Sequence, residues 1–104
     1  METDYRKHYG ESKLLDNFYN RSVAEVLKEI RLEKGLSLTQ VMKKSKMFTR
    51  QTLNKYELGG SKLRLIAFYE LARIYNIEPK ELFNKINYKY ISNLSNYANE
   101  LFNK

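Results

Sequence analysis

The chain of 104 residues has the length of one domain, and its content of 42% apolar and 30% charged residues is typical of a globular protein. It contains no cysteine, which excludes disulfide bonds and thiolate chemistry, and its longest apolar stretch, at residues 65–69, is far too short to span a membrane. The net charge of +7 indicates an anionic partner. The mixed-charge N-terminus does not resemble a signal peptide, so we expect a cytoplasmic protein with no membrane association.

The first segment, residues 1–21, is predicted to be a polar N-terminal leader. Four apolar residues in its second half recur at helical spacing and predict a short helix over residues 11–20. These residues are Leu14, Leu15, Phe18 and Tyr19. The leader also holds the only histidine, His8, which has no partner at metal-ligand spacing, so we expect no metal site.

Two capped helices follow the leader. Ser22 and Glu25 have the spacing of a capping box, in which each side chain binds the backbone amide of the other residue, so a helix is predicted to begin after Ser22. Gly35 ends that helix, because glycine adopts the left-handed conformation at a helix C-terminus with little strain. Ser37 and Gln40 form a second capping box and predict a short second helix.

A third helix is predicted over residues 50–58, with Thr49 as its N-cap and Gly59 as its C-terminal stop. Leu53 and Tyr56 are expected to face the core, beside a large apolar residue of the preceding turn. The opposite, outward face of the helix consists of Arg50, Gln51, Asn54 and Lys55.

The remaining sequence predicts three more helical segments. Residues 61–76 are heavily apolar, so we expect them to form the central buried helix of the fold. Its apolar residues are Leu65, Phe68, Tyr69, Leu71, Ala72 and Tyr75. Pro79 suits the first turn of a fifth helix, where its missing amide leaves no hydrogen bond unmade. Residues 85–104 predict an extra C-terminal amphipathic helix, whose apolar stripe either packs back on the domain or forms a dimer seam. The stripe consists of Ile86, Tyr90, Leu94, Tyr97 and Leu101.

The second and third helices carry the chemistry that indicates a function. Arginine and lysine side chains pair with guanine, and glutamine and asparagine pair bidentately with adenine, so the outward face of residues 50–58 suits the edges of DNA bases. A short exposed helix of this kind fits the major groove of a DNA duplex. Residues 43–64 also carry seven basic side chains against one acidic side chain, which accounts for six of the seven net positive charges. The pattern predicts double-stranded DNA as the partner.

These motifs, in this order, resemble the lambda-repressor-like (Cro/xenobiotic-response-element type) helix-turn-helix family over residues 23–83. The matching pieces are Ile30-Arg31, Lys34-Gly35-Leu36-Ser37, the run from Thr49 to Gly59, Leu71-Ala72 and Glu81-Leu82-Phe83. The resemblance implies an all-α fold in which residues 22–84 form a five-helix DNA-binding domain. The leader precedes this domain, and residues 85–104 follow it as a C-terminal helix, which we regard as a candidate dimerisation element. It also implies an ion pair between Glu57 and Arg31.

The resemblance further implies a set of DNA-binding residues. Thr49, Arg50, Gln51, Thr52, Asn54 and Lys55 occupy recognition-helix contact positions, and Ser37 occupies a position that contacts phosphate. Lys62 and Arg64 lie in a loop that touches the DNA backbone in such proteins. Gln40 and Lys43, on the second helix, complete the predicted set.

Two departures from the family pattern affect this interface. The residue after the second helix cap is usually glutamine, but here it is Leu38, with Gln40 two places later. Leucine cannot donate a hydrogen bond to phosphate, so the phosphate contact that the family's glutamine makes is not expected at this position. The stretch 41–48 is also one residue longer than the commonest family spacing, with Lys46 in place of the turn glycine, so the second helix or the turn must absorb an extra residue.

The resulting expectation is a sequence-specific DNA-binding transcriptional regulator that represses by occupying an inverted-repeat operator as a homodimer. No catalytic motif is present, so we expect neither enzymatic activity nor a cofactor. One alternative is a DNA-binding accessory or autoregulatory protein of a plasmid or mobile element. A second is an antitoxin-like module that grips a protein partner, and a third is non-specific binding to nucleic acid or to an anionic surface.

Overall fold

The computed structural model describes residues 5–103, and the side chains of residues 14–103. The first four residues of the predicted leader and the side chain of His8 lie outside these ranges. As predicted, the described chain is all-α. Its helices are α1 (Tyr5–Glu33), α2 (Leu38–Lys43), α3 (Arg50–Leu58), α4 (Leu65–Ile74) and α5 (Pro79–Phe102). None of the described helices is long and apolar enough to cross a membrane.

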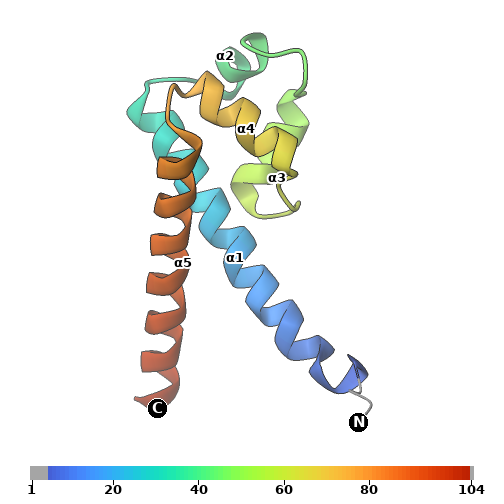
Figure 1. Ribbon diagram of the computed structural model, residues 1–104, viewed down its shortest axis with the longest axis vertical. Coiled ribbons are helices and arrows are strands. Elements are labelled where there is room, and N and C mark those ends of the chain that lie inside the picture. The colour runs from blue at the N-terminus through green and yellow to red at the C-terminus, as the bar shows by residue number, and fades with distance from the viewer. Residues whose placement is uncertain (1–4, 104) are drawn as a thin grey trace.

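Two long helices organise the molecule. Figure 1 shows α1 and α5 meeting near one end of the molecule, where α2, α3 and α4 gather, and diverging toward their free ends. α1 packs against both α3 and α5, and it contributes one buried stripe of the core. Val26, Leu27 and Ile30 of this stripe are each no more than 3% exposed. Through this buried stripe, α1 joins α3 to α5.

α1 is a single helix of 29 residues that includes the predicted 11–20 segment, and it does not begin at Ser22. The capping box predicted for Ser22 and Glu25 is therefore wrong. Ser22 is fully buried in mid-helix, where its hydroxyl donates to the carbonyl oxygen of Phe18 at 2.7 Å and accepts from Nδ2 of Asn93 at 3.0 Å. Glu25 instead pairs with Nε of Arg21 at 3.0 Å. Because α5 and the preceding turn satisfy the serine, it needs no helix terminus.

α4 differs from the prediction in length and in burial. It spans Leu65–Ile74 rather than residues 61–76. Leu71 and Ala72 are buried as expected, but Leu65 is 70% exposed and Tyr69 is 53% exposed. Residues four apart share a helix face, so Leu65 and Tyr69 lie together on the side that faces away from the core. α4 therefore buries one side in the core, as expected, but exposes the other side.

The predicted fifth helix and the extra C-terminal helix are one continuous helix, α5, with Pro79 in its first turn as expected. The apolar stripe of the tail packs back on α1. Ile86 is buried, and the Tyr90 and Tyr97 rings lie 5.3 and 5.0 Å from the rings of Tyr19 and Phe18. Because these contacts hold the second half of α5 against α1, the helix continues through residue 85 without a break.

Candidate nucleic-acid interface

α3 has the predicted bounds because both of its ends are fixed by local contacts. Oγ1 of Thr49 accepts a hydrogen bond from the amide of Thr52 at 3.1 Å and so satisfies one of the free amides of the first turn. Gly59 ends the helix in the left-handed conformation with φ of 75°. A β-carbon at Gly59 would lie 3.7 Å from Cα of Arg21, so this end of α3 also lies directly against α1.

The inner side of α3 is packed against the rest of the core. Leu53 is 3% exposed, and Phe48 is 6% exposed and makes an edge-to-face contact with the ring of Tyr56. The predicted inward face is thus confirmed.

A largely buried ion pair joins α3 to α1, as the family resemblance implied. Nε and Nη2 of Arg31 donate to the two carboxylate oxygens of Glu57 at 2.7 and 2.9 Å, and Nη1 donates to the carbonyl oxygen of Leu36 at 2.8 Å. The two side chains are only 12% and 8% exposed. The hydrogen bond with Glu57 raises the pKa of Arg31, so the guanidinium remains charged. This fork-to-fork pair fixes α3 in both position and rotation.

The outer side of α3 is free, and the predicted contact residues lie there. Arg50, Gln51, Asn54 and Lys55 are all exposed. One shallow hollow along the helix is lined by Leu38, Thr49, Arg50, Gln51 and Asn54. A second hollow is lined mainly by residues of α3, the loop after it and α4, and includes Thr52, Lys55, Lys62 and Arg64. The predicted contact residues of α3 are thus divided between these two hollows. The second hollow also includes the basic loop that carries Lys62 and Arg64.

Comparison with known families identifies this arrangement. A family model described as helix-turn-helix, of the Cro-type, lambda-repressor-like kind, matches residues 27–82. The chain belongs to this helix-turn-helix family. No curated protein and no solved structure matched the chain. The family assignment makes the protein a DNA-binding regulator. The resemblance predicts that α2 and α3 form the helix-turn-helix and that α3 is its recognition helix.

The N-terminal end of α2 is held by the predicted capping box. Oγ of Ser37 accepts from the amide of Gln40 at 3.1 Å, and Oε1 of Gln40 accepts from the amide of Ser37 at 2.8 Å. The cap uses the carbonyl end of the Gln40 side chain, so its amide NH2 is the group suited to a phosphate. Lys43 is exposed at the other end of α2 and lines neither hollow beside the recognition helix.

The turn between α2 and α3 lies in the stretch where the sequence has one residue more than the commonest family spacing. α2 ends at Lys43 and the recognition helix begins at Arg50, so residues 44–49 form the connection. Oγ of Ser45 accepts from the amide of Met47 at 3.1 Å within this turn. From α4, Nη2 of Arg73 donates to the carbonyl oxygen of Lys44 at 3.3 Å. These contacts give the longer turn a defined path without a glycine.

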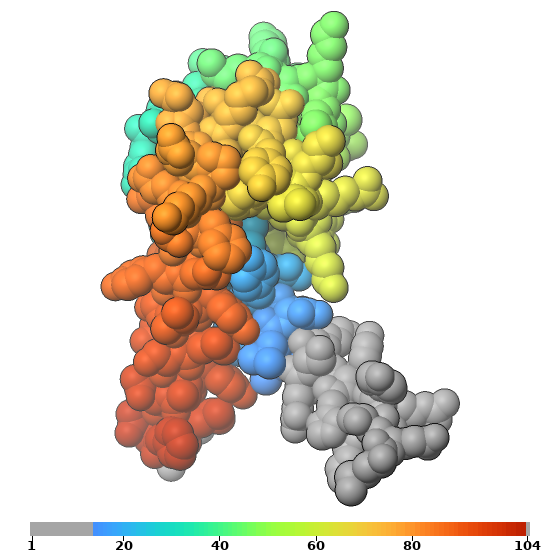
Figure 2. Space-filling model, in the orientation of Figure 1, coloured from blue at the N-terminus to red at the C-terminus, as the bar shows by residue number. Residues whose placement is uncertain are grey.

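The basic loop after the recognition helix contacts α1. Nζ of Lys62 lies 3.5 Å from Oδ2 of Asp16, and both side chains are more than half exposed. Sequence reasoning did not find this pair, because Asp16 meets the loop only through the long-range packing of α1. Figure 2 shows the start of α4 and the loop before it, in yellow, projecting from the side of the molecule. The loop therefore lies at the surface of the molecule.

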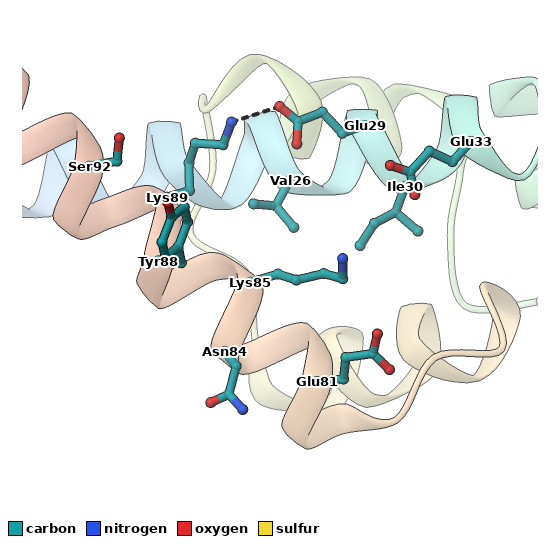
Figure 3. A pocket seen from close by; sticks show the side chains of 10 residues that line it. All are labelled: Val26, Glu29, Ile30, Glu33, Glu81, Asn84, Lys85, Tyr88, Lys89 and Ser92. Carbon is teal, nitrogen blue, oxygen red and sulfur yellow. Dashed lines mark hydrogen bonds and ion pairs between the residues drawn. The ribbon is translucent and has the colours of Figure 1, made fainter.

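A different hollow lies between α1 and α5, and its charges are mixed. Glu29, Glu33 and Glu81 line it together with Lys85 and Lys89 (Figure 3). Nζ of Lys89 donates to Glu29 at 2.8 Å, and this hydrogen bond raises the pKa of Lys89. Three carboxylates make this hollow a poor surface for phosphates, in contrast to the two hollows beside the recognition helix.

Proposed function

We propose that this protein is a sequence-specific repressor that inserts the recognition helix, residues 50–58, into the major groove of duplex DNA. The observation that carries the proposal is the division of α3 into two sides. One side is fixed to α1 by the Arg31–Glu57 pair, and its Leu53 is buried in the core. The other presents exposed side chains that suit base edges. A rigidly held reader of this kind lowers the entropy lost on binding.

The contacts divide by chemistry. Arg50 and Lys55 suit guanine or phosphate, whereas Gln51 and Asn54 suit adenine. Thr49 and Thr52 lie at the first turn of α3, where hydroxyls and the positive end of the helix dipole favour phosphate oxygens. Further phosphate contacts come from the flanking residues Ser37, Gln40, Lys43, Lys62 and Arg64. Occupying an operator in this way blocks other proteins by binding alone and requires no catalysis.

The proposed operator is an inverted repeat bound by a homodimer. The dimer seam predicted along the tail is largely used within the chain, since Tyr90 and Tyr97 pack on α1. Support for self-association instead comes from apolar residues that remain exposed on the two-helix extension, which we define as the parts of α1 before residue 27 and of α5 after residue 82. Leu14, Leu15, Ile91 and Leu101 are 43–65% exposed. Sedimentation at micromolar concentration should give the mass of a dimer, and a monomer mass would contradict this part of the proposal.

The two-helix extension also supports a second candidate function. It lies outside the region that the helix-turn-helix family model matches, and it carries exposed apolar side chains. An antitoxin-like or mobile-element accessory protein would use such a surface to hold a different protein while the helix-turn-helix binds its own promoter. A monomer in free solution that still selects a single half-site would favour this second candidate.

Selection of binding sites from random duplex DNA tests the proposed function. The experiment is run at two salt concentrations, because the phosphate contribution to affinity falls steeply with salt. We expect an enriched inverted repeat that persists at the higher salt. Binding without any enriched sequence, which weakens uniformly as salt rises, would contradict the proposal and indicate non-specific binding to nucleic acid.

A further inference from the structure

Leu38 is the one apolar side chain in the hollow beside the N-terminal half of the recognition helix. It is the first residue of α2, and the Ser37–Gln40 capping box fixes the backbone there. Its side chain is partly buried against the core, and its remaining surface lines the hollow with Thr49, Arg50, Gln51 and Asn54. Each of those four neighbours offers a hydrogen bond, whereas Leu38 offers none.

The major groove of DNA presents one apolar group, the C5-methyl of thymine; the other features on its base edges are donors and acceptors. Gln51 and Asn54, which share the hollow with Leu38, have the amide groups that pair with adenine. Any adenine read in this way is paired with a thymine, whose methyl lies in the same groove. An apolar side chain beside an adenine reader is therefore placed to meet that methyl.

We infer that Leu38 contacts the C5-methyl group of a thymine and so determines sequence preference from outside the recognition helix. The inference rests on the proposed function, because it requires that α3 enters the major groove. It adds a reader from α2, where the family commonly has a phosphate-binding glutamine. At this position, leucine in place of glutamine replaces a contact with a DNA phosphate by a contact with a base.

The test removes the methyl without changing the base pairing. Each thymine of the selected site is replaced in turn by deoxyuridine, and the dissociation constant is measured by fluorescence anisotropy. At one thymine in each half-site, the unmodified protein should bind about fourfold more weakly to the uracil form, the loss expected for one buried methyl group. Gln51→Ala or Asn54→Ala should relax the preference at the same base pair.

Variants at position 38 separate recognition from packing. Leu38→Met keeps an apolar side chain and should keep the difference between thymine and uracil, whereas Leu38→Ala and Leu38→Gln should bind both forms equally. Because each variant is compared with itself on the two DNA forms, a general loss of folded protein cancels. An undiminished thymine preference in Leu38→Ala, or no methyl-dependent position at all, would overturn the inference while the proposed function stands. Failure to select any site would remove the proposed function and the inference together.

Discussion

The helix-turn-helix and the two-helix extension are held together by different kinds of contact. The N-terminal ends of α2 and α3 are set by caps between residues three apart, such as Thr49 with Thr52. The extension is set by contacts between residues far apart in the chain, such as Ser22 with Asn93. A local cap can be recognised in a sequence, whereas a long-range partner cannot. The two regions therefore differ in how the sequence encodes them, and we expect them to differ in what their mutations affect.

The largest expected effect comes from the pair that joins the recognition helix to α1. Glu57→Gln leaves the guanidinium of Arg31, which is 12% exposed, without its charged partner. Loss of one partner of a buried pair should lower the free energy of unfolding by about 3 kcal/mol. Chemical denaturation measures this change. The matched control is Glu25→Gln, which breaks the exposed pair with Arg21 and should change stability by less than about 0.5 kcal/mol. Equal effects of the two substitutions on stability would contradict the role of the Arg31–Glu57 pair in fixing α3 to α1.

On the exposed side of the same helix, a substitution should change binding and leave stability unaltered. Arg50→Ala should weaken binding by about 1–3 kcal/mol at its cognate base pair and relax specificity there. Lys43→Ala, at the far end of α2, should weaken binding to all sequences alike or have no effect. Titrations against sites that differ at single base pairs distinguish the two outcomes. An Arg50→Ala protein with unchanged sequence preference would show that α3 is not the reader.

The extension should respond in the opposite way. Ser22→Ala removes an acceptor from the buried contact with Asn93 and should lower the free energy of unfolding by about 1 kcal/mol, the usual worth of one hydrogen bond. Sequence preference should stay the same, because Ser22 contacts neither hollow beside the recognition helix. Thermal unfolding and binding measured on the same samples check both statements. A shift in the preferred sequence would mean that the two regions are coupled.

The smallest effect is expected where the two regions meet at the surface. Asp16→Asn breaks the exposed pair with Lys62 and should change stability by less than about 0.5 kcal/mol. Because Lys62 then faces DNA without a neighbouring carboxylate, affinity should rise slightly for all sequences and depend more on salt. Lys62→Ala should have the opposite effect on binding: affinity should fall slightly for all sequences and depend less on salt. An affinity that is the same in both variants would place Lys62 outside the interface.

The parts of the fold that followed from the sequence are those with local causes. The bounds of α3, its two faces and the capping box of α2 were predictable because caps and helical periodicity depend on near neighbours. The Arg31–Glu57 pair followed from the family resemblance. The continuity of α1 was not predictable, because the contact that makes Ser22 a mid-helix residue comes from Asn93. The exposure of Leu65 and Tyr69 was missed because an apolar composition does not show which side of α4 meets the core.

The candidate site shows the same division. The polar contact residues of α3 were predicted from residue type and spacing, and the structure places them on the exposed side of the helix. The place of Leu38 beside them, and the pairing of Lys62 with Asp16, depend on how helices pack and are visible only in the fold.

Paired selection from random duplex DNA, with the unmodified protein and with Arg50→Ala, tests most directly whether α3 reads sequence. We predict that the unmodified protein enriches a defined motif and that the variant enriches the same motif with one position in each half-site relaxed. The same motif, with every position retained at equal strength in the variant, would contradict the account of α3 as the reader.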